Sequence, residues 1–252
     1  MSVESAELTK YASNAFLATK ISFINEIALI AEKSNANIQE VQNGMGSDKR
    51  IGSEFLNAGL GFGGSCFQKD ILNLVYIAKS LGLNEVADYW HQVILMNNHQ
   101  RDRFAKNIIK TLYSTVNGKT IAFLGWAFKK DTNDTRESAA IYVADLLMDE
   151  QATIKVYDPK VTATQMQSDI NYLNTRSEKQ NTKYLKTEND PYVAIEGAHA
   201  IALLTEWDEF KKYDWQRIYN GMQKPAFVFD GRNVLDRKAL ETIGFVYKGI
   251  GS

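Results

Sequence analysis

Residues 120–125 read TIAFLG, a short apolar run that ends in glycine and is typical of a buried β-strand. Four similar runs follow, with helix-like segments such as residues 138–148 between them, at residues 152–157, 200–204, 226–229 and 244–247. Alternation of strands and helices predicts an α/β fold with a parallel sheet covered by helices on both faces. The polar stretch 169–190 is expected to be a surface insertion or loop.

The first half of the chain is different, because it contains no proline before Pro159. Apolar residues at steps of three and four predict long helices over residues 5–34 and 84–116, the second of which crosses Asn97-Asn98. Asn37 and Glu40 have the spacing of a capping box and open a short helix over residues 38–42. Seven of the sixteen glycines lie between Gly44 and Gly64, which indicates one special loop among these helices.

The turn signal Asn117-Gly118 is a plausible domain boundary. We therefore expect a helical domain with a long connecting helix over residues 1–117. A Rossmann-like domain with a parallel sheet should follow over residues 118–252.

Composition excludes several function classes. The 252 residues are 44% hydrophobic and 23% charged with a net charge of −1, which argues against a strongly electrostatic nucleic-acid binder. We find no apolar run near the ~20 residues of a membrane span and no secretory signal. A single cysteine, Cys66, rules out an internal disulfide and fits a reducing, cytoplasmic compartment. The three histidines lack zinc-like spacing, so no metal site is expected.

In parallel α/β folds, ligands bind beyond the carboxyl ends of the strands. The first strand here ends in residues 125–131, GWAFKKD, which is not the G-x-G-x-x-G of a dinucleotide site, and we expect no such fingerprint in the chain. Its two lysines, Lys129 and Lys130, suit a phosphate or diphosphate. Exposed lysines are, however, often only solvated.

Residues 61–70, GFGGSCFQKD, carry the clearest chemical signal. Ser65 and Gln68 have capping-box spacing, so a helix is expected to begin at Cys66. A thiol there would lie at the positive end of the helix dipole, which favours the thiolate, and free N–H groups could stabilise an oxyanion. Asp70 follows at i+4 on the same face. The alternative is a buried, inert cysteine.

Five further residues allow two interpretations each. Lys10 and Asn14 form an i,i+4 pair on the first helix, where a lysine commonly reaches water but could stabilise a developing oxyanion. Arg50, Arg136 and Arg232 lie in or after turn-like segments. Taken singly they read as surface arginines, whereas as clamps they would donate bidentate hydrogen bonds to a diphosphate or carboxylate.

Several motifs together, in this order along nearly the whole chain, resemble the UDP-glucose/GDP-mannose dehydrogenase family. They lie at residues 7–10 (ELTK), 14–17 (NAFL), 50–52 (RIG), 61–70 (GFGGSCFQKD), 127–132 (AFKKDT), 134–138 (DTRES) and 229–232 (FDGR). The form FQKD at residues 67–70 is similar to the animal and plant branch of the family. The resemblance implies oxidation of UDP-glucose by two NAD⁺ and water to UDP-glucuronate and two NADH.

The same resemblance assigns catalytic roles. Cys66 would attack the C6 aldehyde, form a thiohemiacetal and then a thioester, which water hydrolyses. Lys10 would stabilise the oxyanion, and Asn14 would orient substrate or water. Asp70 would give acid/base support or position the hydrolytic water.

Binding roles follow by resemblance as well. The glycine-rich loop over residues 57–63 would close on the sugar nucleotide, chiefly through Asn57, Gly61, Phe62 and Gly63. Phe128, Lys129 and Arg232 would hold the UDP-sugar. Arg50 would reach the site of a neighbouring subunit, which implies a homodimer or larger homo-oligomer. NAD would be contacted by Cys66, Phe67, Gln68, Lys69 and Arg136.

Members of the family begin with an N-terminal NAD-binding Rossmann domain that carries the dinucleotide fingerprint, and this chain resembles only the portions that follow it. We therefore expect a part of such an enzyme, without that domain. Two alternatives remain at this point: a non-catalytic module for UDP-sugar binding and dimerisation, and a related dehydrogenase that acts on another sugar nucleotide, such as GDP-mannose or UDP-N-acetylmannosamine.

Overall fold

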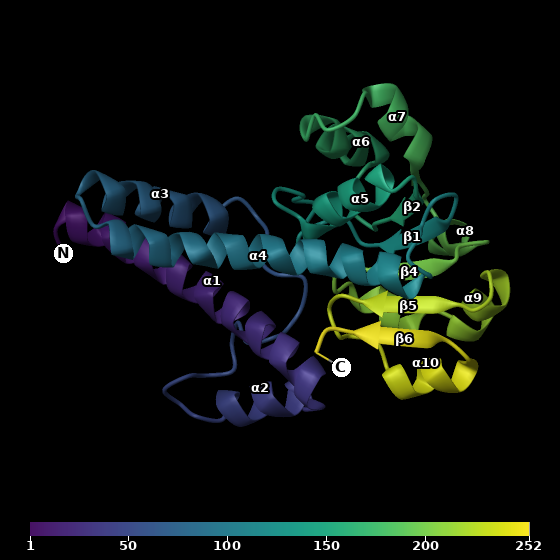
Figure 1. Ribbon diagram of the computed structural model, residues 1–252, viewed down its shortest axis with the longest axis horizontal. Helices are drawn as coiled ribbons and strands as arrows, with labels where there is room; N and C mark the ends of the chain where they lie inside the picture. The colour runs from purple at the N-terminus through teal and green to yellow at the C-terminus, as the bar shows by residue number, and fades with distance from the viewer. Residues whose placement is uncertain (252) are drawn as a thin grey trace. The chain divides into compact units, whose positions relative to one another are not determined.

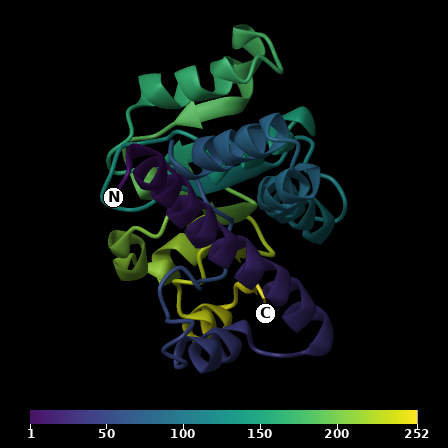
Figure 2. The ribbon, with the colours of Figure 1, turned by 90° about the vertical axis from the view of Figure 1, so that its left-hand side faces the viewer.

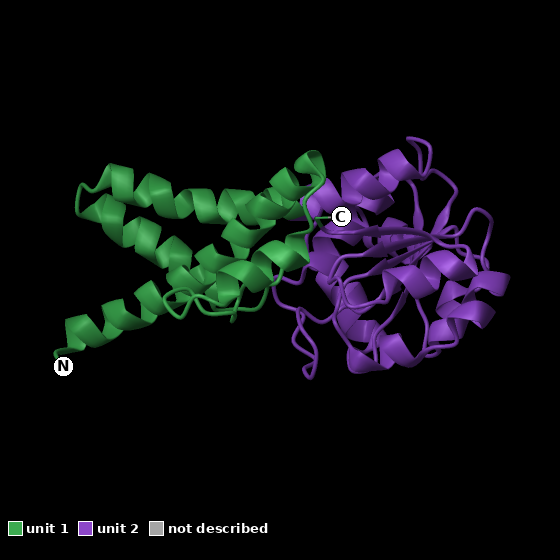
Figure 3. Ribbon diagram, turned by 90° about the horizontal axis from the view of Figure 1, so that it is seen from below, with its two compact units in different colours: residues 1–100, 251–252 green, residues 101–250 purple. Residues whose placement is uncertain are grey.

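The computed structural model describes residues 1–251. These residues form two compact units, shown in different colours in Figure 3. Unit 1 comprises residues 1–100 together with Gly251, and unit 2 comprises residues 101–250. Each unit is described below by itself.

Unit 1 is built from helices, labelled in Figure 1. They are α1 (Val3–Ser34), α2 (Ile38–Gly46), α3 (Phe67–Ser80) and the first turns of α4 (Asn84–Thr111). Figure 2 shows α1, in purple, as the long helix of this unit. The side chain of Ser2 caps α1 by accepting from the N–H of Ser5, and Asn35 ends it in the left-handed conformation. The predicted helices are confirmed, although the cap of α2 is a bond from the N–H of Gln39 to Asn37.

Helix α4 stops earlier than the sequence predicts. It ends at Thr111 instead of residue 116 because Tyr113 and Ser114 adopt left-handed backbone angles, with φ of 65° and 60°. A right-handed helix cannot continue through such residues. The helix does cross Asn97-Asn98 without interruption.

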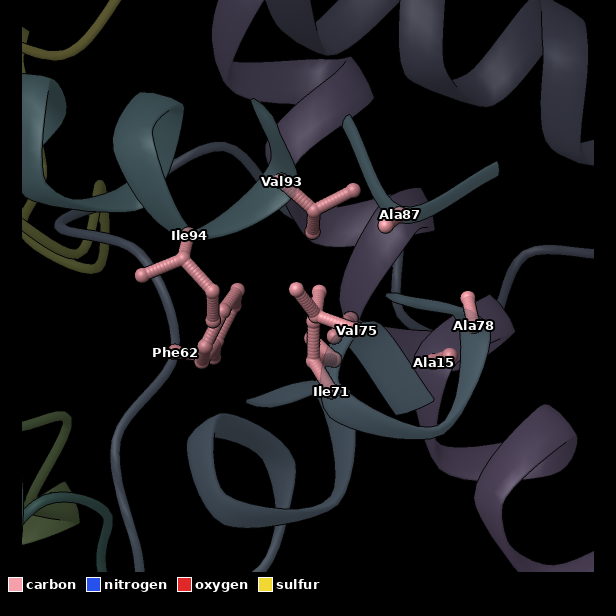
Figure 4. Packing of buried hydrophobic residues seen from close by; sticks show 9 residues of the cluster. Ala15, Phe62, Ile71, Val75, Ala78, Ala87, Val93 and Ile94 are labelled. Atoms are coloured by element: carbon pink, nitrogen blue, oxygen red, sulfur yellow. The ribbon is translucent and has the colours of Figure 1, made fainter. Parts of the chain in front are cut away.

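Small and branched apolar residues form the core of unit 1, seen from close by in Figure 4. Ala15 and Ala18 on α1 are fully buried, so α3 can approach α1 closely. The other buried members come from α3, from α4 and from the loop before α3, and are Phe62, Ile71, Val75, Ala78, Ala87, Val93 and Ile94. Burial of these apolar side chains is the main favourable term in folding of the unit. Since Phe62 belongs to the loop, the same core also fixes the loop onto the helices.

Unit 2 contains a six-stranded sheet in the order β3-β2-β1-β4-β5-β6, with every neighbouring pair parallel. The strands are β1 (Thr120–Leu124), β2 (Thr153–Tyr157), β3 (Leu185–Thr187), β4 (Ala200–Leu203), β5 (Phe227–Asp230) and β6 (Val246–Gly249). The helices are α5 (Ala139–Asp149), α6 (Ala163–Tyr172), α7 (Glu178–Tyr184), α8 (Pro191–Ile195), the 3₁₀ helix η1 (Asp208–Lys212), α9 (Trp215–Gly221) and α10 (Arg237–Ile243). The predicted α/β class with a parallel sheet is confirmed.

The expected loop over residues 169–190 is wrong, because this stretch contains the end of α6, the helix α7 and the edge strand β3. A capping box between Ser177 and Gln180 opens α7. Strand β3 pairs Leu185 with Ile154 of β2. Only Leu185 of its three residues is buried, so the strand lacks the apolar run that would have revealed it.

The two units divide within α4, between Gln100 and Arg101. Phe104, Ile108 and Leu112, in and just after the last turns of α4, are buried, and the ring of Phe104 packs edge-on against Phe229 of β5 at 6.5 Å. This packing assigns those turns to unit 2. The boundary at Asn117-Gly118 lies further along the chain and stays a prediction for the domains.

Helix α1 qualifies the expectation that no segment could span a membrane. Of the helices within residues 1–251, it is the one long and apolar enough to cross a bilayer by length and composition. A core helix of a globular protein passes the same test. One face of α1 is buried, including Ile24 and Ala28, and Ala15 and Ala18 on it pack in the core of unit 1.

Candidate functional site

Residues 58–62, in the glycine-rich loop between α2 and α3, are buried and lie in no helix or strand. Their backbone N–H and C=O groups therefore need partners other than a regular ladder. The N–H of Gly59 donates to Asn25 Oδ1 at 2.8 Å, and Gln100 Nε2 donates to the carbonyl of Gly59 at 2.7 Å. Asn97 accepts from the N–H of Phe62 at 2.8 Å and donates to the carbonyl of Phe62 at 3.1 Å.

We call Asn25, Asn97 and Gln100 the amide clamp. All three side chains are buried. They satisfy both backbone polar groups of two loop residues, Gly59 and Phe62. Leaving such a buried group without a partner costs about 1–3 kcal/mol. Sequence reasoning missed the clamp.

Gly61 lies between the two clamped residues and has a φ of +93°, a conformation that favours glycine. A Cβ atom at this position would lie 2.2 Å from Asn97 Oδ1. The glycine is thus required by the close approach of Asn97. The letters G-x-G-x-x-G do occur at residues 59–64, so the expectation that the pattern is absent is wrong. They follow no strand, and two of their glycines, Gly59 and Gly61, contact the clamp.

Helix α3 begins at Phe67, with the exposed Cys66 as its N-cap residue. The predicted capping box is wrong, because Cys66 itself has helical backbone angles and no side chain caps the helix. Ser65 Oγ instead lies 3.7 Å from Cys66 Sγ. The ring of Phe67 packs edge-on against Phe62 at 5.8 Å, which joins the start of α3 to the loop. The alternative of a buried, inert cysteine is contradicted by the exposure of Cys66.

Asp70, one turn after Cys66, is fully buried. It accepts a hydrogen bond from Asn14 Nδ2 at 2.6 Å, and Lys69 Nζ lies 3.2 Å from its other oxygen. Burial alone would raise the pKa of Asp70, but the bond from Asn14, the Lys69 ammonium and the charge of Lys10 together hold it below its usual value. Asp70 is therefore a carboxylate near neutral pH, able to accept hydrogen bonds and unsuited to donating a proton.

Four predicted catalytic residues thus lie in one part of unit 1. Asn14 and Asp70 are in direct contact, Cys66 precedes Asp70 by one helical turn, and Lys10 lies one turn before Asn14 on α1. The N–H of Asp70 donates to the carbonyl of Cys66 at 2.9 Å. The arrangement combines an exposed thiol, a helix start with N–H groups, a fixed carboxylate and a cation.

Arg50 is 88% exposed, and its guanidinium pairs with Asp48 at 2.6 Å. Lys20 of α1 donates to the carbonyl of Ile51 at 2.9 Å and so anchors the turn that carries Arg50. Asn57, also exposed, accepts a bond from Gln42 at 3.4 Å. These contacts leave the Arg50 side chain at the surface of unit 1, away from the bonds that join Asn14 and Asp70.

In unit 2, the predicted UDP-sugar residues come together at the carboxyl edge of the sheet. Arg232 Nε donates to the carbonyl of Leu204 at 2.8 Å, and its Nη2 donates to the carbonyl of Phe128 at 3.1 Å. The Glu206 carboxylate lies 3.2 Å from Arg232 Nε. Arg232 therefore connects the segments that follow β1, β4 and β5. The exposed Lys129 lies beside Phe128, with Nζ 5.4 Å from the ring centroid.

Two buried carboxylates, Asp158 and Asp230, fix the backbone at the same carboxyl edge of the sheet. Asp158, directly after β2, accepts from the N–H groups of Trp126 and Ala127 at 2.7 and 3.0 Å. Asp230 accepts from the N–H groups of Val234 and Leu235 at 2.9 and 2.8 Å, while burial raises its pKa. Sequence reasoning missed the roles of Asp158 and Glu206. The position of an acidic residue directly after a buried strand is the signal that could have found Asp158.

The remaining charged residues of this edge are paired at the surface. Lys130 pairs with Asp208 at 2.6 Å, and hydrogen bonds from Lys130 and Lys211 lower the pKa of Asp208 to about 2. Arg136 pairs with Asp134 at 2.8 Å, which lowers the pKa of Asp134. Within residues 1–251, no three His, Cys, Asp or Glu side chains form a group that could hold a metal ion.

A parallel sheet with Lys129 and Arg232 at its carboxyl edge is typical of α/β proteins whose ligands bind beyond the strand ends. Comparison with known families agrees with this class. The central domain of the UDP-glucose/GDP-mannose dehydrogenase family matches residues 4–99, and the UDP binding domain of the same family matches residues 122–237. The chain belongs to the UDP-glucose/GDP-mannose dehydrogenase family.

Individual relatives are similar along the whole chain. UDP-glucose 6-dehydrogenase of Mus musculus is 53% identical over 249 residues, which cover 98% of this chain and 50% of the relative. UDP-glucose 6-dehydrogenase 2 of rice, Oryza sativa subsp. japonica, is 51% identical and is covered to 53%. The solved UDP-glucose dehydrogenase of Pyrobaculum islandicum has a TM-score of 0.81 and 33% identity, with all of this chain and 52% of that one covered. The chain therefore spans about half the length of these relatives.

The lowered pKa of Asp70 gives a test. A carboxyl group whose pKa is lowered on folding adds stability above its unfolded value of about 3.9, and this contribution is lost as the pH falls through the folded value. We expect Asp70→Asn to reduce the free energy of unfolding near neutral pH, and we expect the difference from the wild-type protein to shrink below about pH 4. Urea denaturation at several pH values measures this difference in the free energy of unfolding.

Asp88→Asn, at an exposed carboxylate of α4, is the control. A difference for Asp70→Asn that does not change with pH would contradict the lowered pKa of Asp70.

Proposed function

We propose that this chain takes part in the NAD-dependent, four-electron oxidation of UDP-glucose to UDP-glucuronate. The observation that carries the proposal is the group formed by Cys66, Asn14 and Asp70 in unit 1. It presents an exposed thiol at a helix start, one turn from a carboxylate fixed by an amide. The family of the chain and the names of its relatives support the same activity.

Cys66 is the nucleophile in this proposal. Its thiolate adds to the C6 aldehyde produced by the first oxidation and gives a thiohemiacetal. Loss of a hydride to the oxidant and of the hydroxyl proton converts this thiohemiacetal into a thioester, and water then releases the carboxylate and restores the thiol. The N–H groups in the first turn of α3 are available to stabilise negative charge on the reacting oxygen.

The side chains near Cys66 orient the substrate or water and stabilise the oxyanion. Lys10 supplies positive charge for the oxyanion. Asp70 remains ionised, so its role is to hold Asn14 and to accept a hydrogen bond from the hydrolytic water. Asn14 orients the substrate or this water.

NAD would supply the oxidant for both oxidations when bound. The start of α3, with Cys66, Phe67, Gln68 and Lys69, offers N–H groups and a cation for it, and Arg136 offers a second cation. Residues 1–251 contain no strand followed by a glycine-rich turn and a helix, so they do not by themselves form a dinucleotide cradle. We therefore propose that these five residues contact NAD but do not by themselves form its complete binding site, and Cys66 has this contact in addition to its role as nucleophile.

The UDP-sugar is proposed to be held by Phe128, Lys129 and Arg232, of which Arg232 is fixed by two backbone carbonyls and so is preorganised for a diphosphate. In the glycine-rich loop, Asn57, Gly61, Phe62 and Gly63 are proposed to contact the sugar. Arg50 is proposed to act at the site of a neighbouring subunit, which its exposure permits.

A homodimer or larger homo-oligomer is part of the proposal. Phe16, Phe23 and Ile30 are exposed on α1 at intervals of seven residues, so they form one apolar stripe along the helix. A stripe of this kind is suited to packing against a second copy. We place the protein in the cytoplasm because a single reduced cysteine is needed for the chemistry.

Two other functions are less well supported by these observations. A non-catalytic module for UDP-sugar binding and dimerisation has no need of the thiol beside a fixed carboxylate. A dehydrogenase for another sugar nucleotide would use the same residues, and the family name includes GDP-mannose.

Ligand binding is the first test. We expect calorimetry to detect UDP-glucose and UDP binding to the wild-type chain. Arg232→Ala should lower the affinity for UDP-glucose and for UDP by about tenfold or more, because a preorganised charge-assisted contact is lost. Lys211→Ala, at a surface lysine paired with Asp208, is the matched control. Absence of binding to the folded wild-type chain would overturn the proposal.

Catalysis is the second test. We expect NADH to form from UDP-glucose when an NAD-binding domain from a relative is supplied in trans, and we expect Cys66→Ser to abolish it because an alcohol is a poorer nucleophile and forms a less reactive ester. Binding of UDP-glucose with no NADH above the Cys66→Ser background would instead favour the non-catalytic module.

The apolar stripe on α1 predicts the oligomeric state. The double variant Phe16→Glu/Phe23→Glu should shift the wild-type oligomer toward monomer, because it places charges in an apolar contact. Analytical ultracentrifugation measures this shift. Tyr172→Glu, at an exposed aromatic residue of unit 2, should leave the mass unchanged. A wild-type protein that is already monomeric would contradict this part of the proposal.

A further inference from the structure

Asn25, Asn97 and Gln100 are buried side chains that the proposed chemistry does not use. Each is polar, each lies on a helix, and each directs a hydrogen bond at the backbone of the glycine-rich loop. We propose that this amide clamp, and Asn97 above all, is a positioning device that holds Cys66 at the start of α3. The inference rests on the proposed function for the role of Cys66 as nucleophile.

The clamp determines the loop in a specific way. Asn97 uses its oxygen and its nitrogen on the same residue, Phe62, so its amide plane fixes both the place and the orientation of that backbone segment. Gly61 has no side chain, and a Cβ atom there would collide with Asn97 Oδ1 at 2.2 Å. The loop sequence and the clamp therefore fit one another, and a change on either side disturbs the same contact.

Two routes lead from Phe62 to Cys66. Along the chain, Gly63, Gly64 and Ser65 intervene, and Gly64 has a φ of +82°, so the two glycines restrain the thiol only weakly. Through space, the ring of Phe62 meets the ring of Phe67, the first residue of α3 and the neighbour of Cys66. Clamping Phe62 thus restrains the start of α3 directly.

The core strengthens this restraint. Figure 4 shows Phe62 close to Ile94 of α4, and both belong to the same buried cluster. Ile94 lies one helical turn before Asn97. Helix α4 therefore holds Phe62 twice, by its ring through Ile94 and by its backbone through Asn97. Apolar packing alone would leave the backbone free to turn, whereas the amide bonds fix it.

The single cysteine provides the test, because the rate of alkylation of the chain by iodoacetamide reports on Cys66 alone. A thiol held at a helix start reacts faster at neutral pH, since the N–H groups there favour the thiolate. We expect Asn97→Ala to lower the rate at neutral pH by about threefold or more, because the thiol is then no longer held beside the N–H groups at the start of α3. Cys66 is already exposed, so a looser loop adds little access to the reagent.

Asn181→Ala is the matched control, because Asn181 is also a buried amide but lies in unit 2, bonded to Asn171. It should leave the alkylation of Cys66 unchanged. Gly61→Ala disturbs the clamp from the loop side and should lower the rate as Asn97→Ala does, which keeps the test valid if one variant fails to fold.

Three results would overturn the inference: an unchanged alkylation rate in both folded variants, an increased rate, or an equal effect of Asn181→Ala. An increased rate would mean that the clamp shields the thiol or merely stabilises the fold. Calorimetry with UDP on the wild-type chain separates this test from the proposed function, because failure to bind UDP leaves the alkylation comparison intact.

Discussion

The hydrogen bonds between Asn97 and the backbone of Phe62 are the interaction on which the candidate site in unit 1 depends. A buried loop without regular structure is stable only when side chains supply the partners that a helix or sheet would supply. Asn97, with Asn25 and Gln100, does this for Gly59 and Phe62. The start of α3 and the thiol of Cys66 take their place from the loop, which is joined to α3 by the contact between Phe62 and Phe67.

Fixed charges complete the chemistry in each unit. In unit 1, Asn14, Lys69 and Lys10 keep the buried Asp70 ionised, and this carboxylate in turn fixes the amide of Asn14. In unit 2, two backbone carbonyls and Glu206 hold Arg232 at the carboxyl edge of the sheet. Both units use the same physical device, a polar group immobilised before any ligand arrives, which reduces the entropy lost on binding.

Much of the fold follows from sequence periodicity. The long helices, the parallel sheet and the start of α3 to within one residue all came from patterns local in sequence. The edge strand β3 was not predicted because only Leu185 of its three residues is buried. The capping box at Ser65 was wrong because Cys66 is itself helical, a property of one residue's backbone that spacing does not reveal. The clamp was missed because Asn25 lies far in sequence from Gly59, and Asn97 lies far in sequence from Phe62. Asn97 lies within helix α4, and its polar side chain forms the hydrogen bonds that hold the loop at Phe62.

Native-state hydrogen exchange of the Gly59 and Phe62 amides tests the central claim most directly. Exchange of a buried amide that is bonded within a cooperative unit requires that unit to open. We predict that both amides exchange about as slowly as those in the buried turns of α3, such as Ile71 and Val75, although they lie in no helix or strand. Exchange as fast as that of the exposed residues 53–55 would contradict the claim that side-chain amides hold this loop and, through it, Cys66.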